Sequence, residues 1–92
     1  MLAYIAWKAA NKGKDLQPID GLTPDRQFLA GIEQWACGSE PPEHSRMGAI
    51  TNPHSPNEYR INSVVSNIPE FQKAFSCKAG QPMVRENACK VW

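Results

Sequence analysis

One segment of the sequence, residues 51–62 with the letters TNPHSPNEYRIN, carries the side chains best suited to chemistry. It contains an imidazole at His54 and a permanent cation at Arg60, and the prolines around His54 bias the backbone toward extended or turn geometry. Imidazole and guanidinium groups both donate hydrogen bonds well to a carbonyl or to an oxyanion. The segment therefore predicts a site that binds electron-rich oxygen. The alternative is a surface histidine and a surface arginine without a role.

The two histidines are not expected to form a metal site with other residues of this sequence. His44 and His54 are 10 positions apart with Pro53 between them, so they cannot share one helix face. The motif HExxH is absent, and no carboxylate stands at metal-ligand spacing from either histidine. No nucleophilic triad or glycine-rich phosphate loop can be argued from the spacing. We therefore predict no self-contained zinc site and interpret His44 as a solvated side chain.

The three cysteines leave two interpretations open. Cys37, Cys77 and Cys89 are an odd number, far apart and without CxxC spacing, so they fit neither a closed disulfide framework nor a zinc knuckle. They are either three buried free thiols of a cytosolic protein or cysteines of a secreted protein whose partners lie elsewhere.

Composition is that of an ordinary globular chain, with 92 residues, 41% hydrophobic, 21% charged and a formal net charge of +1. Lysine and arginine are spread along the sequence without a basic patch, so no nucleic-acid partner is expected. The longest apolar stretch, residues 1–7, is too short to cross a bilayer and lacks the pattern of a secretion signal. Such a start is typical of the middle of a buried helix, so we interpret the sequence as a piece of a longer protein.

Helical periodicity is clearest in the first part of the sequence. Residues 2–12 predict a helix so apolar that burial on most sides is expected, with Gly13 as its stop. A second helix is predicted to begin after Thr23, a good N-cap residue that precedes a proline. Gly38 is predicted to end this helix in the left-handed conformation, which places Cys37 at the helix end.

Proline and glycine divide the rest of the sequence. Residues 41–50 predict a short helix opened by two prolines, whereas the apolar–polar alternation of residues 59–62 predicts a short extended segment. Asn67 is predicted to cap a further helix, with Glu70 three residues later in a capping-box pattern and Gly80 as the stop.

These patterns predict a mainly α fold of about four helices with long loops. The share of loop is high for so short a chain, which indicates a fragment of a larger helical body. The apolar end, Val91 and Trp92, is expected to pack against another surface.

Several stretches of the sequence together resemble the C-terminal end of the neprilysin and endothelin-converting-enzyme family. They are HSPNEYRIN, NIPEFQKAFSCKAGQPM and the closing CKVW, preceded by LAYIAWKA, FLAG and the tryptophan and cysteine of the second helix. The resemblance runs in order over essentially the whole chain, and the residues of this sequence are closer to those of bacterial members than to those of animal members.

This resemblance implies a zinc endopeptidase that acts on peptides and has a mainly helical fold. In the family, two histidines of an HExxH helix and a glutamate of a second helix hold zinc, and the glutamate of HExxH activates water. All of these positions fall upstream of Met1. Residues 1–92 therefore correspond to the C-terminal part of a catalytic domain without its zinc-binding helices, so this chain is expected to bind no zinc and to be inactive alone.

Two residues match functional positions of the family. The resemblance implies that His54 hydrogen-bonds the developing oxyanion and that Arg60 grips a substrate backbone carbonyl. Two positions depart from the family pattern. Asn52 replaces an aspartate that would orient the imidazole and favour its charged form, and it can accept a hydrogen bond but supplies no charge. Ser63 replaces a glycine, which adds strain if the backbone there needs a positive φ.

The resemblance also implies where the protein acts and what it contacts. The family's cysteines at these positions bond to cysteines outside the segment, which favours a periplasmic, extracellular or cell-envelope location. The implied partners are a peptide substrate and the missing upstream catalytic region. Self-association of the fragment is expected through the uncovered apolar face of residues 2–10. The alternative function is a small helical interaction module without catalysis, and an HExxH motif encoded upstream would decide for the peptidase.

Overall fold

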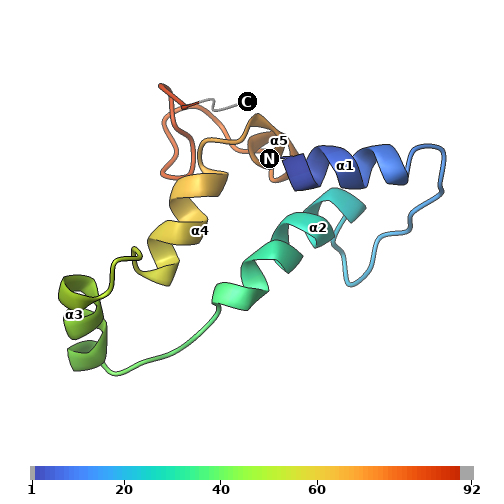
Figure 1. Ribbon diagram of the computed structural model, residues 1–92. Helices are drawn as coiled ribbons and strands as arrows, with labels where there is room; N and C mark the ends of the chain where they lie inside the picture. Colours follow the sequence, from blue (N-terminus) through green and yellow to red (C-terminus); the bar gives the residue numbers. More distant parts are fainter. Residues whose placement is uncertain (1, 90–92) are drawn as a thin grey trace.

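The computed structural model describes residues 2–89 and is mainly helical, with no β-strand in this range. Its elements, coloured along the chain in Figure 1, are α1 (Leu2–Ala10), α2 (Pro24–Glu33), the 3-10 turn η1 (Gln34–Ala36), α3 (Pro42–Thr51), α4 (Asn57–Val65) and α5 (Pro69–Ala74). The predicted fold class is confirmed, with five α-helices in the described part of the chain where about four were expected. Val91 and Trp92, which were expected to pack, lie outside the described residues. No helix between residues 2 and 89 combines the length and apolar character needed to cross a membrane.

The start of α2 follows the sequence signals, whereas its end does not. Thr23 is the N-cap, and its hydroxyl accepts the N–H of Arg26 at 3.4 Å. The last turn tightens into η1, where Cys37 donates its N–H to the carbonyl of Gln34 at 3.1 Å and turns extended. Gly38 therefore has no left-handed conformation, and its predicted role as helix stop is wrong. Cys37 does stand at the helix end, as predicted.

Residues 59–62 are helical within α4, so the predicted extended segment is wrong. The helix begins directly after Pro56, which already has φ −52°. Ile61 is half-buried and Val65 is only 2% exposed, and these two residues share one face at the i, i+4 spacing of a helix. Burial of this helix face outweighs the apolar–polar alternation of residues 59–62, which extends over only four residues.

Asn67 does not cap α5, because Ile68 takes the N-cap position without a side-chain bond. The side chain of Asn67 instead binds the backbone of a distant segment, because its Oδ1 accepts a hydrogen bond from the N–H of Cys89 at 3.0 Å. The helix ends at Ala74 with Phe75 as its C-cap, and the left-handed residue that follows is Ser76, with φ 55°, so Gly80 is not its stop.

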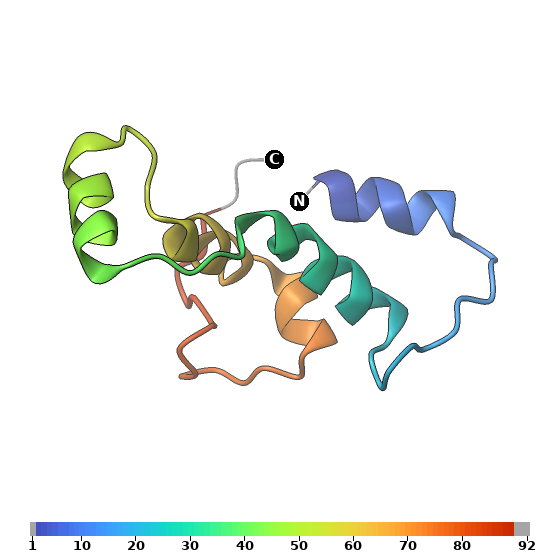
Figure 2. The ribbon, with the colours of Figure 1, turned by 90° about the horizontal axis from the view of Figure 1, so that it is seen from below.

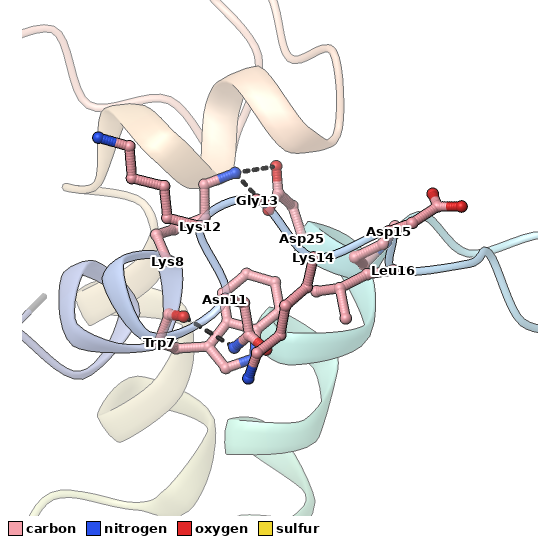
Figure 3. A pocket seen from close by; sticks show the side chains of 10 residues that line it. Trp7, Lys8, Asn11, Lys12, Gly13, Lys14, Asp15, Leu16 and Asp25 are labelled. Atoms are coloured by element: carbon pink, nitrogen blue, oxygen red, sulfur yellow. Dashed lines mark hydrogen bonds and ion pairs between the residues drawn. The ribbon is translucent and has the colours of Figure 1, made fainter.

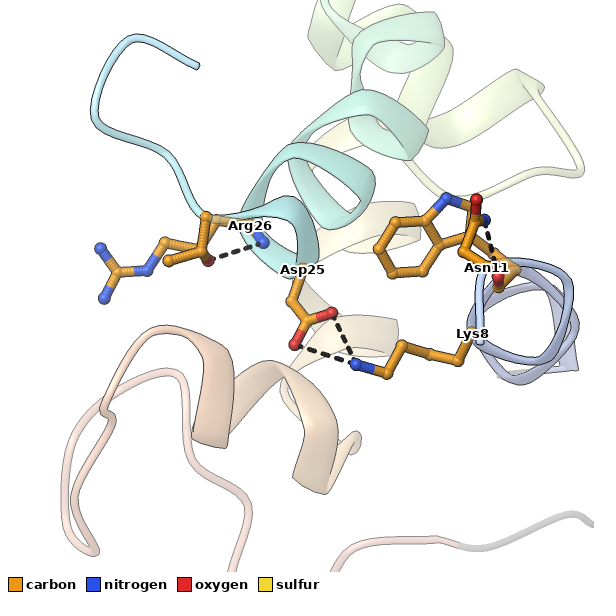
Figure 4. A network of polar contacts seen from close by, with 6 residues as sticks. Lys8, Asn11, Asp25 and Arg26 are labelled. Atoms are coloured by element: carbon orange, nitrogen blue, oxygen red, sulfur yellow. Dashed lines mark hydrogen bonds and ion pairs between the residues drawn. The ribbon is translucent and has the colours of Figure 1, made fainter. Parts of the chain in front are cut away.

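The core is small and lies where α1, α2, η1 and the α4–α5 corner meet. Leu29 is fully buried, and the other buried apolar residues are Tyr4, Ala36, Val65 and Ile68. Aromatic contacts join α1 to α2, with ring centroids 4.9 Å apart for Trp7–Phe28 and 5.7 Å for Tyr4–Phe28. Beside them Lys8 bonds Asp25 at 3.1 Å, as Figure 4 shows.

The molecule is extended rather than spherical. Its radius of gyration is 15.5 Å, whereas a compact domain of this length has about 12 Å. Figures 1 and 2 show α3 standing apart from the other helices, joined to them by two connections. Helix α1 is largely exposed in this chain, with Leu2 60% and Ile5 55% exposed, which agrees with the prediction of an uncovered apolar face on residues 2–10. Much apolar surface is therefore left exposed in this chain.

Candidate functional site

His54 lies in the connection between α3 and α4, formed by residues 52–56. Asn52 ends α3, with its N–H bonded to the carbonyl of Gly48 at 2.9 Å, and takes an extended conformation. Its side-chain oxygen then accepts the backbone N–H of His54 at 2.9 Å, which closes an Asx turn. This turn and the flanking prolines fix the backbone that carries the imidazole.

The same side chain of Asn52 also orients the His54 ring. Its Oδ1 atom lies 3.2 Å from Nδ1 of the imidazole. The backbone N–H of His54 donates to this atom, so the atom is the amide oxygen of Asn52 and not its nitrogen. An amide oxygen can only accept, so Nδ1 of the His54 ring carries the proton in this contact. Nε2 is then an acceptor in the neutral ring and a donor in the charged ring. The residue is exposed, so Nε2 is free to meet a ligand.

Arg60 lies in the first half of α4, and its guanidinium is stacked on an aromatic ring. The Cζ atom is 4.8 Å from the ring centroid of Trp35 in η1. Among the hydrogen bonds and ion pairs of residues 2–89, none involves the guanidinium, so its N–H donors are open to solvent. The contact between Trp35 and Arg60 was not predicted, because no spacing rule in the sequence pairs the end of α2 with α4. Ser63 lies within α4 without a positive φ, so it causes no strain.

The other histidine stays apart from this loop. His44 lies on α3, and its Nδ1 is 3.0 Å from a carboxylate oxygen of Glu40, which precedes the helix. Both side chains are exposed, which fits the interpretation of His44 as a solvated side chain. Asn52, His54 and Arg60 therefore come from one loop and the helix after it, whereas His44 faces solvent from another helix.

A hollow of the surface lies elsewhere, beside α1 and the start of α2 (Figure 3). It measures about 460 Å³ and is lined by Trp7, Lys8, Asn11, Lys12, Gly13, Lys14, Asp15, Leu16, Pro24 and Asp25. Its Lys8 is engaged with the carboxylate of Asp25, and the hydrogen bond and charge of that carboxylate raise the pKa of the Lys8 ammonium. Neither His54 nor Arg60 lines this hollow, so it is separate from the candidate site.

The cysteines are free in the described part of the chain. Cys37 and Cys89 are exposed and Cys77 is half-buried, so the interpretation as three buried thiols is wrong.

The chain belongs to peptidase family M13, whose family model matches residues 1–91. Among curated proteins it is similar to endothelin-converting enzyme 1 of Rattus norvegicus, with 39% identity over 90 residues. It is 38% identical over 92 residues to neprilysin-1 of Caenorhabditis elegans and 37% identical over 91 residues to membrane metallo-endopeptidase-like 1 of Mus musculus. Each match covers 98% of this chain and 12% of the relative. The resemblance seen in the sequence is thus confirmed, and the chain spans about an eighth of these relatives' length.

Membership of this family implies zinc in the whole enzyme, and the residues described here do not fit that ion. From residue 2 to residue 89 no three side chains of histidine, cysteine, aspartate or glutamate come together in a group able to hold a metal. The candidate site therefore consists of two exposed side chains, His54 and Arg60, and of Asn52, whose oxygen contacts the ring of His54.

Proposed function

We propose that this chain is the C-terminal part of the catalytic domain of a zinc-dependent endopeptidase. In the whole enzyme, His54 and Arg60 face the peptide substrate, and the zinc-binding helices come from the preceding part of the protein. The observation that carries this proposal is the anchored imidazole of His54 in a chain of peptidase family M13. The chain alone is inactive, because it supplies donors to the reaction but no group that activates water.

The role of His54 is to donate a hydrogen bond from Nε2 to the oxyanion that develops on the scissile carbonyl. Asn52 holds Nδ1, so the ring can donate from Nε2 only in its charged form. A charged donor is worth most where charge develops, in a cleft from which the substrate and the rest of the enzyme exclude water. Removal of one such donor costs about 2.7–4 kcal/mol of transition-state stabilisation.

The role of Arg60 is to bind a backbone carbonyl of the peptide on one side of the scissile bond. Its guanidinium keeps its N–H groups free within residues 2–89 and presents them in a fixed fork. A carbonyl is present in both substrate and transition state, so this contact acts mainly on substrate binding.

Substitution of His54 in the full-length peptidase tests this function. We expect His54→Ala to lower kcat by about 10²–10³-fold on a fluorogenic peptide. Zinc content, measured by atomic absorption, stays unchanged because the ligands lie elsewhere. The matched control is His44→Ala, which removes an exposed histidine of α3 and leaves kcat unchanged. An unaltered kcat in His54→Ala overturns the assignment.

The encoding gene gives a second test. The proposal requires an HExxH motif upstream of residue 1, followed by a helix with the third, glutamate ligand. A reading frame without this motif overturns the peptidase and leaves a helical interaction module.

The proposal extends to location and assembly. Cys37, Cys77 and Cys89 pair with cysteines outside this segment, which places the whole enzyme in the periplasm, the cell envelope or the extracellular space. The exposed apolar side chains of α1 pack against the missing catalytic region. Without that region the isolated chain self-associates through the same face.

A further inference from the structure

Within residues 2–89, two arginines stack on aromatic rings, and their other contacts differ. Cζ of Arg26 lies 5.3 Å from the ring centroid of Phe75, and its Nε also donates to the carbonyl of Ala74 at 2.6 Å. Arg26 therefore ties α2 to α5. Cζ of Arg60 lies closer to its ring, 4.8 Å from the centroid of Trp35, and no hydrogen bond or ion pair within residues 2–89 uses its guanidinium.

The position of Trp35 is not that of a core residue. Its side chain is 63% exposed, whereas the next residue, Ala36, is 8% exposed and faces the core. An indole that stays in solvent gains little from burial within this chain. Within the described residues, the guanidinium of Arg60 lies over its ring. Its ring faces α4, which packs on η1 and carries Arg60.

Stacking on a ring restrains a guanidinium without using its donors. The ring attracts the face of the cation, and the five N–H groups lie in the plane of the guanidinium and point away from the contact. An unrestrained arginine side chain must lose its rotamer freedom when it binds a ligand, whereas a stacked one has already lost part of it.

We propose that Trp35 is a positioning residue, which holds the guanidinium of Arg60 so that its in-plane N–H groups meet a backbone carbonyl of the peptide substrate. This inference rests on the proposed function of Arg60. Trp35 acts on the substrate only through Arg60 and touches no reacting atom.

Peptidase kinetics of the full-length enzyme test the inference. We expect Trp35→Leu to raise KM by about two- to five-fold with kcat changed by less than about two-fold, since an exposed stack contributes modestly and the carbonyl contact is made throughout the reaction. Trp35→Phe keeps an aromatic face and restores most of the lost affinity. The matched control is Phe75→Leu, which removes the other arginine stack and leaves KM unchanged. A fall in kcat and in thermal stability with no change in KM, not rescued by Trp35→Phe, overturns the positioning role.

A double-mutant cycle separates this inference from the proposed function. Arg60→Ala alone is expected to raise KM by more than Trp35→Leu does, and Trp35→Leu added to Arg60→Ala has no further effect. If Arg60→Ala leaves KM unchanged, the proposed role of Arg60 fails, and the role of Trp35 fails with it. If Arg60→Ala raises KM but Trp35→Leu acts equally in both backgrounds, only the inference about Trp35 is wrong.

Discussion

The Oδ1 atom of Asn52 accepts two hydrogen bonds from His54, one from the backbone N–H at 2.9 Å and one from ring Nδ1 at 3.2 Å. One neutral oxygen thus fixes both the turn that carries the histidine and the direction of its ring. A backbone N–H is always a donor, so the double contact also determines which end of the amide faces the histidine. The loop between α3 and α4 is therefore arranged to present Nε2 outward.

The first prediction concerns this oxygen. We expect Asn52→Ala to lower kcat of the full-length peptidase by about two- to ten-fold, the equivalent of ~0.5–1.5 kcal/mol for one hydrogen bond. Asn52→Asp should raise kcat, because a carboxylate keeps the geometry and favours the charged ring that donates from both nitrogens. Steady-state kinetics at neutral pH check both variants. Equal rates for the asparagine, alanine and aspartate enzymes would show that the ring needs no partner at Nδ1.

The sequence predicted the helices whose ends carry strong local signals. Thr23 with the proline after it marked the start of α2, and the double proline at residues 41–42 marked α3, because capping and fixed φ are properties of a few neighbouring residues. His54 could be singled out because prolines stiffen its loop, whereas Asn52 was singled out only through the resemblance to the family.

The wrong predictions depended on contacts between residues far apart in the sequence. Asn67 has the type and spacing of an N-cap, yet its oxygen accepts the N–H of Cys89, 22 positions away. The helical period at residues 59–62 is set by burial of Val65 in a core that a four-residue window does not contain. The stack of Arg60 on Trp35 likewise depends on how η1 meets α4, which local propensity does not determine.

The second prediction concerns the core. Leu29 has no exposed surface, and the core is so small that few other side chains contribute to it. Leu29→Ala should lower the free energy of unfolding by about 2–5 kcal/mol, through lost burial and the cavity left behind. Ile50 on α3 is 83% exposed, so Ile50→Ala is the matched control and should change the free energy of unfolding by less than about 0.5 kcal/mol. Urea unfolding followed by circular dichroism measures both, and a similar loss in the two variants would contradict the core described here.

The third prediction is a dependence of stability on pH. Partial burial raises the pKa of the Glu33 carboxyl above its ordinary value of 4.5. The folded chain then binds a proton more readily than the unfolded chain, so this residue makes the fold less stable as pH rises from 4.5 through the raised value. Glu33→Gln removes the charge and should raise the urea midpoint at neutral pH.

Below pH 4.5 both states carry the protonated carboxyl, and the difference between Glu33 and glutamine should disappear. Glu43 is exposed on α3, so Glu43→Gln serves as the control and should show no gain at neutral pH. A gain in Glu33→Gln that persists unchanged in acid would point to a cause other than the partly buried charge.

The fourth prediction concerns the uncovered face of α1. Leu2 and Ile5 are more than half exposed, and on α1 they lie three positions apart, so they share a face. Contact between such faces of two chains removes apolar surface from water, so the isolated chain should sediment as a dimer or larger species at micromolar concentration. Ile5→Glu places a charge in that contact and should shift the chain to the monomer. Ile50→Glu is the control, because Ile50 is still more exposed but lies on the separate α3. Sedimentation velocity that finds a monomer for the unchanged chain, or dissociation by Ile50→Glu rather than Ile5→Glu, would place the uncovered surface elsewhere.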